Sequence, residues 1–324
     1  MVMRYAAVFL VSLCCFLACT KPADMHTGSS EHSSPNQVVI GFSQMNHINP
    51  WRVAETNDLK RVAQARGYTL LVLDADSSIE KQTKDVQALI EAGADYIVCT
   101  PYTYEGYGEI AQMCKDAQIP LILLDRETSG VPGVDYLTFI GSDFRAEGVM
   151  AAEYLARITN GKAKIVEIHG NIGASCTTGR SEAFSETIAR EPEMEIVAFG
   201  YADYERIAGQ KVMEEIILSY GTDFNAVYAH NDDMAVGAIQ ALKSAGMKPG
   251  LDVVLVSVDG SKDGFRSIIA GELAASVECT PKLGTILFDT IESHQRSENI
   301  PSRIIIEDRL FDASNAEELF HEGF

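Results

Sequence analysis

Short apolar runs alternate with longer amphipathic stretches along this chain, and this alternation constrains its fold more than any other feature. From Gln37 onward an apolar run recurs about every thirty residues. Runs of this length are typical of buried strands, and the stretches between them are long enough for the helices that connect parallel strands. The pattern predicts an α/β fold built on doubly wound parallel sheets. The predicted strands are Val38–Phe42, Thr69–Leu73, Tyr96–Cys99, Leu121–Leu124, Leu137–Ile140, Lys164–Ile168, Ile196–Phe199, Ala226–Tyr228, Val253–Val256 and Ala275–Val277.

Three of the intervening helices are well marked by their ends. The stretches Trp51–Arg66, Ile79–Ala92 and Asp232–Ala245 are each followed by a glycine, the residue that most readily adopts the left-handed conformation of a helix cap. The chain has 324 residues, more than one core usually holds, and its β-α units form two groups that meet near Phe139–Gly141. We therefore predict two similar lobes.

The first residues have the pattern of an export signal. The apolar run Tyr5–Ala18 follows Arg4 and is shorter than the roughly twenty residues that a membrane-spanning helix needs. We predict that residues 1–18 are a lipoprotein signal peptide and that Cys19, which follows Phe16-Leu17-Ala18, carries a lipid anchor; ordinary signal-peptidase cleavage is the alternative. Residues 19–36 are rich in Ser, Pro, His and charge, which predicts a disordered tether.

The net charge of −20 excludes some partners. A chain this acidic repels nucleic acid and anionic membrane surfaces. We therefore expect no nucleic-acid partner and no membrane contact except through the lipid anchor. The cysteines after the tether form no Cys-x-x-Cys pair, and buried thiols are their expected state.

Polar residues that follow the predicted strands are the candidate site, because ligands of open parallel sheets bind beyond the carboxyl ends of the strands. The chain's only tryptophan, Trp51, lies in this set and offers a stacking face for the C–H surface of a sugar. Arginines, carboxylates and amides supply paired hydrogen bonds for hydroxyls, and three charges of each sign favour a neutral ligand. The predicted ligand-binding residues are Asn49, Trp51, Arg52, Asp125, Arg126, Arg180, Asn231, Asp259 and Glu278.

Other interpretations of single residues remain open. Trp51 is also suited to packing its helix on the sheet, and Asp232 or Asp233 to capping the next helix. His169 and His230 lack a partner at metal-ligand spacing, so packing roles are favoured and no metal site or cofactor is expected. The chain contains no Gly-x-Ser-x-Gly, His-Glu-x-x-His, Walker or dinucleotide motif, so we predict that it is not an enzyme.

Five segments carry a family resemblance: Gly41–Gln44, Trp51–Asn57, Leu123–Arg126, Val227–Met234 and Ala275–Glu278. With them the chain, from Val38 to the C-terminus, resembles the periplasmic sugar-binding proteins of ABC importers. Within the ribose- and galactose-binding class it is most similar to the galactofuranose-binding proteins. The resemblance implies a type I periplasmic binding fold with a three-crossing hinge near Phe139–Ser142, Ala275–Cys279 and Leu310–Asp312. The N-terminal lobe would then be residues 37–139 plus 279–311, and the C-terminal lobe residues 140–278 plus 312–324.

The resemblance also implies a function. A small neutral sugar would bind between the lobes, and the closed form would be recognised by the permease subunits of an ABC importer. The protein would be a monomer held by its lipid at a periplasmic or cell-surface location. The alternative is a sugar sensor that presents its closed form to a chemoreceptor or a sensor kinase.

Overall fold

The computed structural model describes residues 37–324, which form one compact unit. The predicted signal peptide, the lipidation site Cys19 and the tether at 19–36 lie outside the described residues. Within 37–324, no helix combines the length and the apolar character that crossing a membrane requires.

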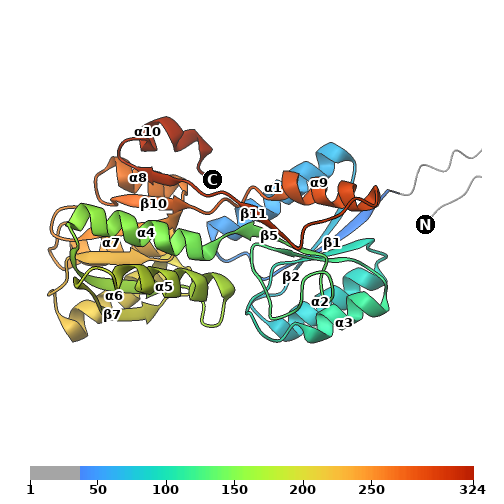
Figure 1. Ribbon diagram of the computed structural model, residues 1–324, viewed down its shortest axis with the longest axis horizontal. Helices are drawn as coiled ribbons and strands as arrows, with labels where there is room; N and C mark the ends of the chain where they lie inside the picture. The colour runs from blue at the N-terminus through green and yellow to red at the C-terminus, as the bar shows by residue number, and fades with distance from the viewer. Residues whose placement is uncertain (1–36) are drawn as a thin grey trace, which may run out of the picture. The chain divides into compact units, whose positions relative to one another are not determined.

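Two six-stranded sheets organise the molecule, each at the centre of one lobe (Figure 1). The first has the order β11-β5-β4-β3-β1-β2, and all of its pairings are parallel. Its strands are β1 (Val39–Gln44), β2 (Thr69–Asp74), β3 (Tyr96–Cys99), β4 (Leu121–Leu124), β5 (Thr138–Ser142) and β11 (Arg303–Ile306).

The second sheet has the order β12-β10-β9-β8-β6-β7. Its strands are β6 (Lys162–His169), β7 (Glu193–Tyr201), β8 (Ala226–Ala229), β9 (Val254–Asp259), β10 (Ala275–Glu278) and β12 (Leu310–Asp312). Only the edge strand β12 runs antiparallel to its neighbour, β10. The prediction of two lobes with doubly wound, mostly parallel sheets is confirmed.

Helices cover the sheets, and this explains the continuous apolar runs of the inner strands. Strands β3, β4 and β8 are buried along their whole length because a parallel sheet is covered on both faces. The helices are α1 (Pro50–Arg66), α2 (Ile79–Glu91), α3 (Gly108–Asp116), α4 (Phe144–Thr159), α5 (Ser175–Ile188), α6 (Arg206–Tyr220), α7 (Asp232–Ser244), α8 (Lys262–Ile269), α9 (Gly284–Gln295) and α10 (Ala316–Leu319), followed by a short 3₁₀ turn, Phe320–Glu322. Gly67 caps α1 with φ of 76°, as its position in the sequence predicts.

The chain passes between the two sheets three times: after β5, after β10, and between β11 and β12. One hydroxyl joins these crossings, since Ser142 Oγ lies 3.0 Å from a carboxylate oxygen of Asp308 and 3.7 Å from the sulfur of Cys279. Strand β5 continues to Ser142 in the first sheet, and β12 begins at Leu310 in the second. The residue at which each lobe begins and ends stays a prediction.

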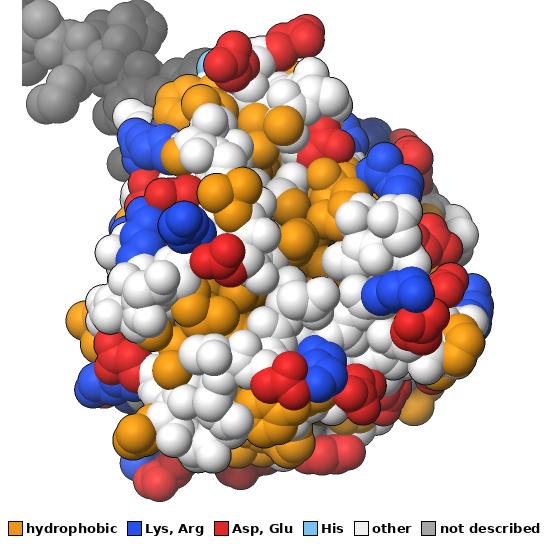
Figure 2. Space-filling view, turned by 90° about the vertical axis from the view of Figure 1, so that its left-hand side faces the viewer, with side chains coloured by type: hydrophobic (Ala, Val, Ile, Leu, Met, Phe, Trp, Pro, Cys, Tyr) orange, Lys and Arg blue, Asp and Glu red, His pale blue; other side chains and the backbone are white. Residues whose placement is uncertain are grey.

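Charges of both signs are mixed on the surface. Figure 2, which views the end of the molecule formed by the second lobe, shows acidic and basic side chains interspersed with small apolar areas. The excess of negative charge is dispersed there rather than gathered into one patch.

Candidate ligand-binding site

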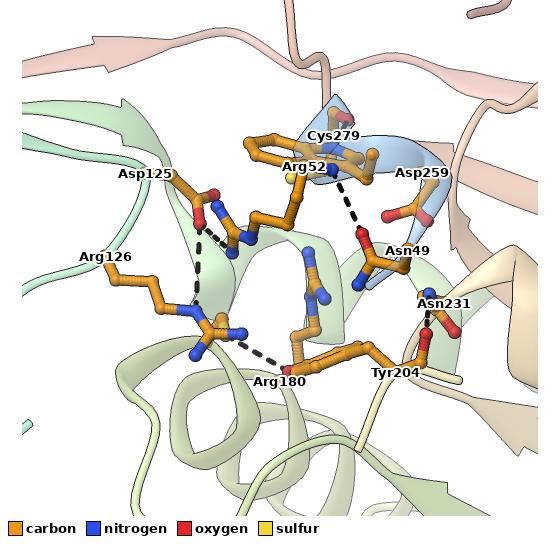
Figure 3. A pocket seen from close by; sticks show the side chains of 11 residues that line it. Asn49, Arg52, Asp125, Arg126, Arg180, Tyr204, Asn231, Asp259 and Cys279 are labelled. Atoms are coloured by element: carbon orange, nitrogen blue, oxygen red, sulfur yellow. Dashed lines mark hydrogen bonds and ion pairs between the residues drawn. The ribbon is translucent and has the colours of Figure 1, made fainter. Parts of the chain in front are cut away.

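A small cavity lies where strand ends of both sheets meet (Figure 3). It is lined by eight of the nine predicted residues and by three others: Asn49, Trp51, Arg52, Asp125, Arg126, Cys176, Arg180, Tyr204, Asn231, Asp259 and Cys279. The sheet topology accounts for this convergence, because segments that leave the carboxyl ends of parallel strands share one edge.

The start of α1 supplies one wall of the cavity. The side chain of Asn49 caps this helix by accepting a hydrogen bond of 3.0 Å from the backbone N–H of Arg52. Trp51 follows in the first turn, and its indole N–H donates to the carbonyl of Cys279 at 2.7 Å. The guanidinium of Arg52 lies 4.5 Å from the centre of the Trp51 rings. One face of the indole is therefore covered by the protein's own cation.

Arg52 is neutralised from within the first lobe. Its guanidinium donates to the carboxylate of Asp125 at 2.5 Å and to that of Glu55 at 3.1 Å. Burial by itself lowers the pKa of Arg52, but these two carboxylates raise it above its ordinary value. Burial raises the pKa of Glu55 to about 7, against the opposing effect of Arg52. Arg52 therefore positions Asp125 and brings no net charge to a ligand.

Arg126 is held differently, by neutral groups. It donates to the carbonyl of Tyr102 at 3.0 Å and to the side-chain oxygen of Asn171 at 2.9 Å, and it is 2% exposed. Its Nε is buried and has no hydrogen-bond partner among residues 37–324; the nearest carboxylate oxygen, of Asp125, is 3.8 Å away. This N–H thus lacks a hydrogen-bond acceptor.

The second lobe supplies Arg180, Asn231 and Tyr204. The Nε–H of Arg180 donates to Glu147 at 2.6 Å, and an Nη–H donates to the carbonyl of His230 at 2.8 Å. Asn231 caps α7 through the N–H of Met234 at 2.9 Å, so its placement is fixed by the helix that it begins. Capping falls to Asn231 rather than to Asp232 or Asp233.

Asp259 ends strand β9 with a backbone φ of 132°, a conformation that costs energy for any residue with a side chain. Its side chain is 7% exposed and makes no hydrogen bond to the part of the chain that the structure describes. Burial, reinforced by the charge of Asp232, raises the pKa of Asp259 well above its ordinary value. A carboxylate that lines the cavity without a hydrogen-bond partner is expected where a ligand completes the hydrogen bonding.

Glu278 departs from the prediction. It lies outside the cavity lining, and its two carboxylate oxygens accept hydrogen bonds from Arg309 at 2.6 and 2.8 Å. Successive side chains of a strand point to opposite sides, so Cys279 faces the cavity where Glu278 was expected.

Sequence reasoning missed Tyr204, Cys176 and Cys279 as lining residues. The hydroxyl of Tyr204 is 2.8 Å from Thr177 Oγ1 and 3.1 Å from the sulfur of Cys176. Tyr204 follows the end of β7, which runs to Tyr201 rather than to the predicted Phe199, so the rule of reading strand ends applied to it too. Both cysteines are buried free thiols, as expected, and this expectation gave no reason to place them at the site.

Known proteins that resemble this chain in sequence are binding proteins. A family model described as a periplasmic binding protein domain matches residues 40–294. The chain is 37% identical over 272 residues to the galactofuranose-binding protein YtfQ of Escherichia coli (strain K12), covering 83% of this chain and 86% of that protein.

Two solved structures are similar at the level of the fold and the sequence. The periplasmic binding protein component of the arabinose ABC transporter from Shewanella sp. ANA-3, bound to α- and β-L-arabinofuranose, has a TM-score of 0.85 and 33% identity, covering 88% of this chain and 95% of its own. A protein from Mycobacterium smegmatis in complex with β-D-fucofuranose has a TM-score of 0.84 and 35% identity, covering 87% and 93%.

Proposed function

This chain belongs to the periplasmic binding protein family, whose members bind solutes rather than catalyse reactions, and we propose that its solute is a neutral monosaccharide in the furanose form. Two of the relatives that it matches over most of its length are a galactofuranose-binding protein and the binding protein component of an arabinose ABC transporter.

The charge balance of the cavity is the observation that carries the proposal. Arg52 is paired with Asp125 and Glu55, and Arg180 with Glu147. Two charged side chains of the cavity lining have no close ion-pair partner of their own: Arg126, which is 3.8 Å from the already paired Asp125, and Asp259. The positive group donates hydrogen bonds and the negative group accepts them. This pair suits a ligand without net charge, whose hydroxyls both accept and donate.

The relatives support the furanose form. The galactofuranose-binding relative and the arabinofuranose and fucofuranose complexes share the five-membered ring, not one sugar. Ring form is therefore the common feature that we carry over to this chain.

Closure of the lobes is the proposed signal to the importer. Arg126 and Asp259 lie on different sheets, so a ligand touches both only when the lobes are closed. The permease subunits then receive the closed, sugar-loaded protein, which acts as a monomer.

We further propose that the mature protein is a lipoprotein anchored through Cys19, with residues 19–36 as its tether. Incorporation of a labelled fatty acid in cells tests this: the label should be lost in Cys19→Ala. A labelled Cys19→Ala protein would refute the anchor and leave the sugar site unaffected.

The sugar proposal is tested by titration calorimetry with galactose, L-arabinose, D-fucose, ribose and myo-inositol. The anomeric carbon of the bound sugar, labelled with ¹³C and followed by NMR, then identifies the ring form. We expect one of the first three sugars to bind as a furanose, and Arg126→Gln to abolish this binding, while the exposed Arg190→Gln retains it. Binding of a pyranose alone refutes the ring form, and no binding of any sugar refutes the whole proposal.

A further inference from the structure

Beside the sugar site, the second sheet brings together three side chains that the proposed function does not use. Glu167 and His169 lie on the same face of β6, and His230 follows the end of the neighbouring strand β8. All three are buried, with exposed fractions of 2%, 8% and 0%. Their spacing in the sequence gave no indication of a cluster, because the pairing of β6 with β8 creates it.

The three ligand-type atoms are close to one another. Nε2 of His230 lies 2.9 Å from Oε1 of Glu167, and Nε2 of His169 lies 3.3 Å from Oε2. One atom from each residue can be chosen so that all lie within 4.8 Å of one another. Zinc bonds of about 2.0–2.2 Å place tetrahedral ligand atoms roughly 3.3 Å apart, so small side-chain adjustments bring these atoms to one ion.

Glu167 differs from other buried carboxylates in the groups that neutralise it. Glu55 and Glu147 each face an arginine, and Asp232 accepts hydrogen bonds from three serines. Among residues 37–324, Glu167 forms ion pairs only with the imidazoles of His169 and His230, and neither imidazole is a permanent cation. A buried carboxylate needs a compensating positive charge, and a bound metal ion supplies one.

Two ring nitrogens at the cluster lack hydrogen bonds. Nε2 of His169 and Nδ1 of His230 are buried without a partner in the described chain. The first of them faces the Glu167 carboxylate at 3.3 Å but is not aligned for a hydrogen bond. This ring nitrogen therefore faces the carboxylate without a hydrogen bond of its own.

We propose that Glu167, His169 and His230 form a binding site for a divalent transition-metal ion, with Zn²⁺ the best match. Two imidazoles and one carboxylate are a common zinc ligand set, and a fourth position remains for water. The rings of Phe199 and Tyr201, which are 62% and 42% exposed, lie 5.5 and 4.9 Å from the ring of His169 and form the outer side of the site.

The site is connected to the sugar cavity through the backbone. The carbonyl of His230 accepts the hydrogen bond of Arg180, and Asn231, the next residue, lines the cavity. On the other strand, His169 is two residues before Asn171, which bonds to Arg126. Metal binding would hold both strand ends in the arrangement that the sugar requires, so zinc should raise the affinity for sugar.

The test is a titration of the metal-free protein with Zn²⁺ against a chromogenic chelator, with Co²⁺ as a spectroscopic probe. We expect one Zn²⁺ per chain, visible absorption of tetrahedral Co²⁺, and at least a tenfold loss of affinity in Glu167→Gln and in His169→Asn. His294→Asn, which removes an imidazole next to Tyr96 and outside the cluster, should bind zinc as the parent does. His26→Asn/His32→Asn removes the imidazoles near the N-terminus and should also retain the site.

X-ray absorption at the zinc edge identifies the ligands, which should be nitrogen and oxygen without sulfur. Sulfur ligands, equal zinc affinity in the parent and in both cluster variants, or no zinc binding at all would each overturn the proposal. The last result would mean that a proton, shared between the carboxylate and the imidazoles, fills the place assigned to the metal. Because the readout is metal affinity, these outcomes are independent of whether the cavity binds a furanose. Melting curves of the metal-free variants verify that they fold, and His169→Asn, at the most exposed of the three positions, keeps the test valid if Glu167→Gln does not.

Discussion

The guanidinium of Arg126 donates a hydrogen bond of 2.9 Å to the side-chain oxygen of Asn171, and this bond links the two lobes. Arg126 follows β4 of the first sheet, whereas Asn171 follows β6 of the second. Two more contacts cross at the same place: Tyr104 N–H to the Gly173 carbonyl at 2.7 Å, and Glu127 N–H to Ser175 Oγ at 3.0 Å. A residue that lines the cavity thus also holds the lobes closed.

Asn171→Ala should weaken sugar binding without unfolding the protein. A hydrogen bond to a charged group contributes about 1.5–3 kcal/mol, and this one exists only when the lobes are closed. We therefore expect the dissociation constant to rise roughly ten- to hundredfold by calorimetry. The exposed Asn299→Ala is the matched control. An unchanged affinity in Asn171→Ala would show that closure does not depend on this bond.

Asp259→Asn should stabilise the sugar-free protein while weakening sugar binding. The raised pKa of Asp259 means that the folded state disfavours its charged form. The stability that protonated Asp259 contributes is complete below the ordinary aspartate pKa of about 4 and is lost as the pH rises toward the pKa of the folded state. The variant should therefore be more stable than the parent at neutral pH, but not near pH 4. Melting temperatures at both pH values measure this, and the dissociation constant should rise roughly tenfold or more. The control is Asp76→Asn, at an exposed position that also has a positive φ. Equal melting temperatures for Asp259→Asn and its parent at neutral pH would contradict the prediction.

Asp308→Asn should remove part of the pH dependence of stability. Burial, and then the charge of Glu147, raise the pKa of Asp308 to about 8, although Ser142 donates a hydrogen bond to it. The parent therefore loses stability as the pH rises from its ordinary pKa of about 4 through the folded value, and the variant does not. Urea unfolding across this range should give a difference between the two that grows with pH. Exposed Glu307→Gln, next in the same crossing, should follow the parent; a constant difference for Asp308→Asn would exclude a raised pKa.

Gly148→Ala should destabilise the protein, although alanine normally favours a helix. Gly148 lies within α4, where an added Cβ would be 2.4 Å from the backbone carbonyl of Arg180 in α5. Overpacking of this kind costs about 1–3 kcal/mol, and moving α5 displaces Arg180 from the cavity. Calorimetric melting and sugar titration should both show the loss. Gly108→Ala, with open space around its Cβ, is the control and should be neutral or stabilising. The same result for Gly148→Ala would mean that α4 and α5 separate without a loss of stability.

Much of the fold could be predicted because it depends on local patterns. The strands over Tyr96–Cys99 and Leu121–Leu124 have the bounds that their apolar runs predict, and α1 ends at the predicted glycine cap. The edge strands β11 and β12 were not predicted as strands. They are short and half-exposed, and they become strands by pairing with β5 and β10, which lie far away in the sequence.

The sequence by itself determined most of the residues that reach the cavity, eight of the nine predicted, because side chains at the carboxyl ends of parallel strands converge in any such sheet. Only the tertiary structure decided what each of them does there. It pairs Arg52 with Asp125, turns Glu278 toward Arg309 and brings His169 next to His230. These relationships join residues from different strands and helices, and their distances follow from sheet order and register rather than from spacing along the chain.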